Sequence, residues 1–180
     1  MQRQTKPFAQ SQHIDGFQFA ESGRALRGSW PLVGFARLQD VLSAADAGVE
    51  YADVEYEIRG ARDGFGRIAL RVAITGNAGL ICQRCLSAVA FSLKIDSLLV
   101  LAHNEAEIEA QPVDPEGPDR IVGSKEMSVE ALLEDEIVLA IPFAPRHVKC
   151  AGDDESKSEA QASPFADLRG LLNAGGRVRK

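Results

Sequence analysis

All three cysteines of this chain lie in two short segments, one of which also contains a histidine. The first segment places Cys82 and Cys85 at C-x-x-C spacing, and the second ends in His147 and Cys150. Thiolate sulfur and imidazole nitrogen are ligands that Zn²⁺ prefers, and four of them complete a tetrahedral structural site. If folding brings the two segments together, these side chains form a zinc site of the Cys₃His type.

Two other interpretations of these cysteines remain open. Cys82 and Cys85 can occupy a strand turn without binding a metal, with Cys150 as an incidental surface thiol, because C-x-x-C is a common pattern. A thioredoxin-like redox pair is the least favoured interpretation, since that chemistry places the first cysteine at the N-terminus of a helix. Strand patterns flank this C-x-x-C on both sides instead.

Alternating apolar residues predict the strands that position the C-x-x-C. Residues 54–58 and 68–75 alternate between apolar and polar types, and residues 60–66 between them are of types that favour turns. We therefore expect a β-hairpin with one solvated face. Residues 76–79 contain two glycines and are expected to end the second strand. A long strand is expected over residues 90–102, which places the C-x-x-C on a turn between strands.

Helical periodicity and capping residues predict the helices. Residues 34–47 have apolar residues at helical spacing, and Gly48 follows at the position of a C-terminal cap. Ser128 can cap a second helix, which Pro142 would end. A short helix is expected over residues 163–172.

These elements predict an α+β fold, with an antiparallel β-sheet or partly open barrel packed by two or three helices. The domain is expected over residues 24–150, with a mobile acidic loop over residues 103–125, which contain three prolines. Residues 1–23 are interpreted as a flexible lead-in, and residues 151–180 as an acidic linker, the short helix and a basic tail. A chain of this length can bury a core without disulfides or metals.

The charge of the chain is negative overall and unevenly distributed. A net charge of −6 argues against a protein that coats nucleic acid through phosphate contacts alone. Residues 103–136 contain eleven acidic and two basic residues, whereas residues 163–180 contain one acidic and four basic residues. We expect the basic residues of this tail to contact RNA phosphates, because ordering a short flexible end costs little. They are Arg169, Arg177, Arg179 and Lys180.

Three consecutive carboxylates, Glu134, Asp135 and Glu136, lie on the second predicted helix. Adjacent residues of a helix point in different directions, so the three cannot converge on one substrate atom. The favoured interpretation is a solvated helix face. The alternative is a partner-binding strip that contacts a basic protein.

Several blocks of the sequence, in order, resemble one known protein family. The blocks are Cys82–Leu86, the run from Glu134 to Pro142 that continues to Pro145 and His147, Ser163–Leu168 and, more weakly, Arg24–Gly28. In these blocks the chain resembles the large ribosomal RNA subunit accumulation protein family, the YceD-like proteins of bacteria and plastids. The resemblance implies a non-enzymatic factor that supports 23S ribosomal RNA accumulation through processing or early assembly of the large subunit.

Two functional hypotheses follow from this resemblance. The first is a cytoplasmic factor that binds precursor RNA or an assembly intermediate, since residues 1–20 lack the apolar run of a signal peptide. The alternative is an adaptor that contacts a basic ribosomal protein through its acidic segments, with a structural zinc site and no direct RNA contact. A zinc enzyme is disfavoured, because four protein ligands leave no open position for water.

Overall fold

The computed structural model describes residues 12–43, 53–112, 114–115 and 117–150. The chain divides into two units, residues 1–147 and residues 148–180, and only the first three residues of the second unit are described. The expected acidic linker, short helix and basic tail therefore lie outside the described residues, as does Gly48.

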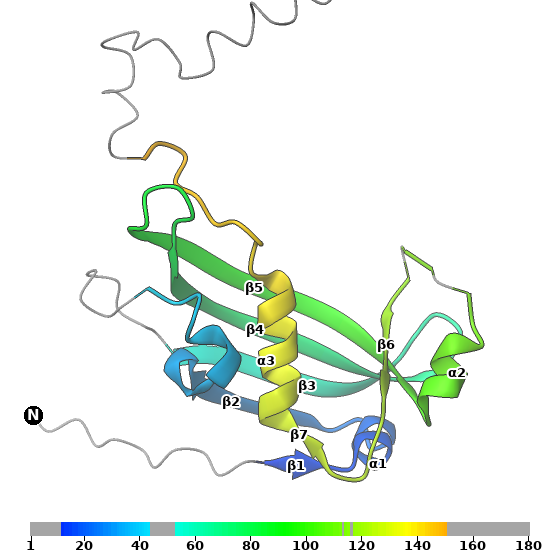
Figure 1. Ribbon diagram of the computed structural model, residues 1–180. Coiled ribbons are helices and arrows are strands. Elements are labelled where there is room, and N and C mark those ends of the chain that lie inside the picture. Colours follow the sequence, from blue (N-terminus) through cyan, green and yellow to red (C-terminus); the bar gives the residue numbers. More distant parts are fainter. Residues whose placement is uncertain (1–11, 44–52, 113, 116, 151–180) are drawn as a thin grey trace, which may run out of the picture. The chain divides into compact units, whose positions relative to one another are not determined.

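A five-stranded sheet forms the centre of the first unit, in the order β2-β3-β4-β5-β6 (Figure 1). The antiparallel strands are β2 (Ala25–Pro31), β3 (Asp53–Arg62), β4 (Ile68–Ile81) and β5 (Ala88–Ala102). The edge strand β6 (Asp119–Val122) pairs parallel to β5. A separate two-stranded ladder joins β1 (His13–Ile14) to β7 (Met127–Ser128).

Three helices accompany the sheet in the described part of the chain. They are α1 (Gly16–Glu21), α2 (Glu105–Glu109) and α3 (Val129–Ala140). The sheet is mostly antiparallel and open, so the predicted α+β fold is confirmed, and the sheet is not a closed barrel. None of the described helices is both long and apolar enough to span a lipid bilayer.

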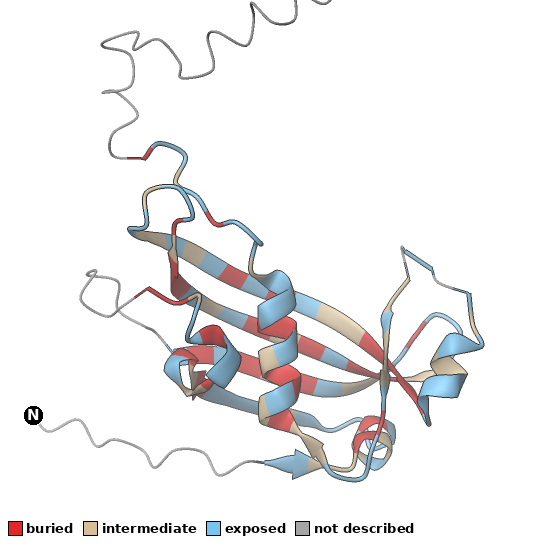
Figure 2. Cartoon of the chain, in the orientation of Figure 1, coloured by how far each residue is buried: buried red, intermediate tan, exposed pale blue. Residues whose placement is uncertain are grey.

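The predicted hairpin and its solvated face are confirmed by β3 and β4. Alternation along β3 places Val54 and Ile58 in the core and leaves Glu55 and Arg59 exposed, and Figure 2 shows the same alternation along the neighbouring strands. The expected strand end at residues 76–79 is wrong, because β4 continues to Ile81. A Cβ on Gly76 would lie 2.8 Å from Cγ1 of Val54, so this glycine permits close strand contact instead of ending the strand.

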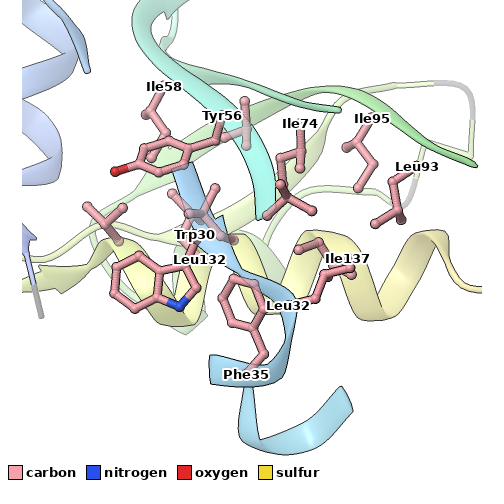
Figure 3. Packing of buried hydrophobic residues seen from close by; sticks show 14 of the residues in the cluster. Trp30, Leu32, Phe35, Tyr56, Ile58, Ile74, Leu93, Ile95, Leu132 and Ile137 are labelled. Atoms are coloured by element: carbon pink, nitrogen blue, oxygen red, sulfur yellow. The ribbon is translucent and has the colours of Figure 1, made fainter. Parts of the chain in front are cut away.

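Helix α3 lies across one face of the sheet (Figure 1) and closes the core. Its N-cap is the predicted Ser128, whose hydroxyl accepts the N–H of Ala131 at 3.2 Å. Leu133 and Ile137 are fully buried, and Figure 3 shows Ile137 among the side chains of the sheet and the β2 region. The helix ends at Ala140, two residues before Pro142, as predicted.

The helix predicted over residues 34–47 is wrong in its described part. Two 3₁₀ turns occupy the region instead, η1 (Leu32–Gly34) and η2 (Ala36–Leu38). Phe35 between them is extended, with φ −84° and ψ 118°. This break lets Phe35 stack on the buried Trp30 with ring centroids 6.0 Å apart, so tertiary packing overrides the helical periodicity.

The lead-in expected over residues 1–23 contains two regular elements that the prediction missed, β1 and α1. Asp15 caps α1 by accepting the N–H of Gln18 at 3.0 Å. The helix packs so closely on β3 that a Cβ on Gly60 would lie 2.2 Å from the carbonyl oxygen of Ala20. Residues 13–21 are therefore part of the packed domain.

The mobile loop expected over residues 103–125 is also wrong in part, because it contains α2 and β6. Asn104 caps α2 by accepting the N–H of Glu107 at 3.0 Å. Strand β6 pairs its four residues with Leu99–Ala102. The acidic segment thus supplies the edge of the sheet.

Asp63 organises the β3–β4 turn and makes stability depend on pH. Its carboxylate accepts the backbone N–H of Phe65 at 3.0 Å and the Nε–H of Arg67 at 2.6 Å. Burial raises the pKa of Asp63, but the hydrogen bonds from Arg67 and Phe65 outweigh it and hold the pKa below its ordinary value. Stability from this carboxylate is therefore complete above the unfolded-state pKa of about 4 and is lost as pH falls through the folded-state value.

We expect Asp63→Asn to lower the urea midpoint at pH 7, and this difference from the unsubstituted chain to shrink toward pH 3. The matched control is Asp96→Asn, because Asp96 forms an exposed ion pair with Arg71 and is expected to contribute less. Urea unfolding of both variants at the two pH values measures the effect. Equal midpoints for Asp63→Asn and the unsubstituted chain at pH 7 would contradict the prediction.

Candidate metal centre

The C-x-x-C lies on the turn that joins β4 to β5, as predicted. Cys82 follows the last residue of β4, and its N–H donates to the carbonyl of Ser87 at 2.9 Å. The N–H of Leu86 donates back to the carbonyl of Cys82 at 2.9 Å. Cys82 thus ends a strand and precedes a tight turn, so the thioredoxin-like interpretation lacks the helix that it requires.

Leu86 adopts an unusual backbone conformation in this turn. Its φ is +60°, in the left-handed region, which costs a non-glycine residue about 1–2 kcal/mol. The side chain of Leu86 is 75% exposed, so burial of this side chain does not offset the unfavourable backbone conformation. The conformation closes a turn in which the N–H groups of Arg84 and Cys85 point at the sulfur of Cys82.

Hydrogen bonds attach the segment after α3 to this turn. The N–H of Gln83 donates to the carbonyl of Pro145 at 2.8 Å. The imidazole of His147 lies with Nε2 2.9 Å from the carbonyl oxygen of Ala88 and with Nδ1 3.4 Å from Sγ of Cys85. Since a carbonyl only accepts, Nε2–H is the donor, and Nδ1 is the nitrogen that faces the sulfur atoms. A backbone carbonyl bound to the second ring nitrogen is the usual support of a metal-binding histidine.

The four predicted ligands come together. One ligand atom from each of Cys82, Cys85, His147 and Cys150 lies within 4.8 Å of the other three. In a tetrahedral zinc site with Zn–S bonds of about 2.3 Å, the ligand atoms are roughly 3.8 Å apart, so a small contraction would complete the site. Only two residues separate Cys150 from His147, so the chain keeps their Cα atoms within about 11 Å of each other. The donor set and its spacing fit Zn²⁺.

Local hydrogen bonds favour the ionised forms of these groups. The N–H of Cys85 is the largest cause that lowers the pKa of Cys82, to about 5, against the opposing effect of burial. Hydrogen bonds to Cys82 and then Cys85 raise the pKa of His147 above its ordinary value. The thiolate is the form of cysteine that binds Zn²⁺, so the turn prepares Cys82 as a ligand. Cys150 is buried, which contradicts the interpretation as an incidental surface thiol.

The interpretation of the three consecutive carboxylates as a solvated face is corrected for Glu134 and Glu136, whereas Asp135 is exposed. Glu134 accepts the backbone N–H and the Nε–H of Arg37, and Asp135 pairs with the same guanidinium. Glu136 is only 7% exposed. The helical pattern could not reveal this, because Arg37 lies 97 residues before Glu134 and its position depends on the η2 turn.

The fold and the cluster define a class of protein. It is an α+β protein with an open sheet, in which cysteines and a histidine suited to zinc gather at the turn between two strands. The chain belongs to the YceD family, described as large ribosomal RNA subunit accumulation protein, which matches residues 70–172. The predicted resemblance is thereby confirmed, and the match includes the three stronger blocks and excludes Arg24–Gly28. Comparison with curated proteins and with solved structures gave no match.

Proposed function

We propose that this chain is a non-enzymatic cytoplasmic factor whose metal centre presents a cationic surface to precursor 23S ribosomal RNA or to a large-subunit assembly intermediate. Membership of the YceD family supports the link to accumulation of large-subunit ribosomal RNA. The RNA contact itself is inferred from the charge of the metal centre.

The charge around the metal centre is the observation that supports RNA contact. Residues 81–93 and 137–150 contain Arg84, Arg146 and Lys149 and no acidic residue, in a chain of net charge −6. All three cationic residues are exposed. Such side chains attract phosphates, so RNA meets a locally cationic surface here in a chain that is acidic overall.

Exposed apolar side chains beside these cations support the same proposal. Phe143 is fully exposed, and Leu86 projects from the C-x-x-C turn. Single-stranded RNA is recognised in part by stacking of its bases on aromatic side chains. The predicted basic tail, with Arg169, Arg177, Arg179 and Lys180, is proposed to add further phosphate contacts.

We further propose that Cys82, Cys85, His147 and Cys150 bind Zn²⁺ in a structural role. The ion would connect the β4–β5 turn to the segment after α3 and offset the charge of the thiolates. Four protein ligands close the coordination sphere, which supports a factor without catalytic activity.

The test is the ratio of large-subunit to small-subunit ribosomal RNA in host cells depleted of this protein. We expect the ratio to fall and the full-length chain to restore it. The Arg84→Ala/Arg146→Ala double variant should fail to restore it. The matched control is Arg59→Ala/Arg62→Ala, which removes the same charge. Arg59 and Arg62 pair with Arg71 and Ile68, which precede Cys82 by eleven and fourteen residues, so they lie roughly 36 to 46 Å from the metal centre along the strand.

Two outcomes would contradict this proposal in different ways. An unchanged ratio after confirmed depletion would overturn the role in RNA accumulation. Restoration by Arg84→Ala/Arg146→Ala as complete as by the control would retain that role and overturn the RNA-binding surface.

A second candidate function is the adaptor, which contacts a basic ribosomal protein through Glu134, Asp135 and Glu136. The observation that favours it is the buried carboxylate of Glu136, which lines a groove beside α3. Under this hypothesis, a basic ribosomal protein co-purifies with the chain after nuclease treatment. Loss of all such proteins on nuclease treatment would contradict it.

A further inference from the structure

A groove of about 620 Å³ lies between α3 and the edge strand β6. Figure 1 shows where these two elements lie on the sheet. All four residues of β6 line one wall. The other wall is formed by six residues of α3: Ala131, Leu132, Asp135, Glu136, Val138 and Leu139. The groove is on the first unit and is separate from the four metal-ligand candidates.

The wall formed by β6 has an available backbone edge. β6 is the last strand in the sheet order and pairs only with β5 among the described residues. Backbone groups on the outer edge of such a strand can pair with an extended chain, which is how many proteins bind peptides. The groove therefore adjoins an edge to which an extended chain can add as a strand.

Apolar side chains line both walls of the groove. Leu99 and Leu132 are buried, while Val122, Val138 and Leu139 are exposed, Leu139 to 75%. Aliphatic side chains of an added strand would cover these exposed groups. A wholly polar occupant would leave them in water.

Glu136 specifies the charge of the occupant. Its side chain is more than nine-tenths buried and lines the groove, and it has no hydrogen bond or ion pair within the described part of the chain. Its neighbours Glu134 and Asp135 are instead bound by Arg37. Glu136 therefore gives the groove a negative charge that is not paired with any group of the described chain, so a cation in the groove is favoured.

The remaining charges of the groove reinforce this preference. Asp119 and Glu126 also line it, against Arg120 and Arg37, the second of which is already paired with Asp135. RNA is disfavoured as an occupant, because its phosphates would meet Asp119, Glu126 and Glu136.

We infer that the groove between α3 and β6 binds an extended segment of a basic protein, which pairs with the edge of β6, buries aliphatic side chains and places a lysine or arginine against Glu136. This inference deepens the adaptor function proposed above and is independent of RNA contact at the metal centre.

The test uses the full-length chain and a fluorescein-labelled peptide of four Lys-Val repeats, with binding followed by fluorescence anisotropy. We expect Glu136→Gln to weaken binding at least tenfold and Leu139→Ala to weaken it several-fold. Glu130→Gln, on the same helix and outside the groove, should leave the affinity unchanged. Circular dichroism and thermal unfolding verify that each variant is folded. A peptide with N-methyl groups on alternate residues should bind at least tenfold more weakly, because it cannot pair with β6.

Three results would overturn the inference. They are equal affinities of Glu136→Gln and the unsubstituted chain, equal binding of a peptide in which glutamate replaces lysine, and binding of polyuridylate that depends on Glu136. Peptide binding without co-purification of a ribosomal protein would support the groove and contradict the adaptor function. Co-purification without peptide binding would retain the adaptor function and overturn the groove.

Discussion

Replacement of Cys82 by serine is expected to release one equivalent of zinc per chain and to lower the free energy of unfolding by about 3–4 kcal/mol. A ligand that binds only the folded chain raises the free energy of unfolding. This increase has the stated size when the concentration of free zinc is about 100 to 1,000 times the dissociation constant. Cys82 is fully buried, and hydrogen bonds, first from the N–H of Cys85, lower its pKa to about 5, so it is the ligand that the turn prepares as a thiolate. Metal analysis of the purified chain and urea unfolding measure the two effects.

Two controls separate loss of metal from general damage to the turn. Ser87→Ala changes a residue whose hydroxyl lies 3.1 Å from Sγ of Cys85 and supplies no ligand, so it should retain the zinc. Removal of metal from the unsubstituted chain with a chelator should reproduce most of the Cys82→Ser effect. A purified chain without zinc, whose urea midpoint does not rise when zinc is added, would show that the cluster is not a metal centre.

The second large effect is expected in the core, where Leu133→Ala should lower the free energy of unfolding by about 2–5 kcal/mol. Leu133 is 0% exposed on the face of α3 that packs against the sheet. Its truncation removes apolar contacts and leaves a cavity. Since the whole free energy of unfolding of a domain is about 5–15 kcal/mol, this one change would remove a large part of it.

Leu139→Ala is the matched control for Leu133→Ala, because it makes the same substitution six residues later on the exposed side of α3. We expect it to change the free energy of unfolding by no more than about 0.5 kcal/mol. Urea unfolding of the two variants gives the comparison. Similar midpoints for both would mean that α3 does not pack on the sheet as described.

The parts of the fold that sequence patterns predicted are those determined by local chemistry. The alternation in β3 and β4 and the capping of α3 by Ser128 each depend on residues close together in the chain. Among the missed elements, β6 and the 3₁₀ turns depend on distant residues. The four-residue strand β6 exists through its pairing with β5, and the 3₁₀ turns around Phe35 form because that ring packs on Trp30.

The candidate metal centre, like the fold, was predicted only where local sequence determines it. The types and spacing of the four ligands indicated the chemistry, but not the closure of the cluster. Closure depends on backbone groups that no side-chain pattern reveals, namely the carbonyls of Pro145 and Ala88. The burial of Glu136 was missed for a related reason, because helical periodicity does not show which parts of the chain cover each face.

The distance along the chain between the two halves of the metal centre has a consequence for when its surface exists. Cys85 and His147 are 62 residues apart, and α3 lies between them. The hydrogen bond from Gln83 to Pro145 therefore closes a long loop, and the pairing of the hairpin and the packing of α3 offset the entropy that this closure costs. An incompletely folded chain presents the C-x-x-C turn without His147. The surface proposed to meet RNA thus depends on the folded state of the sheet and α3, and local unfolding of either would separate its two halves.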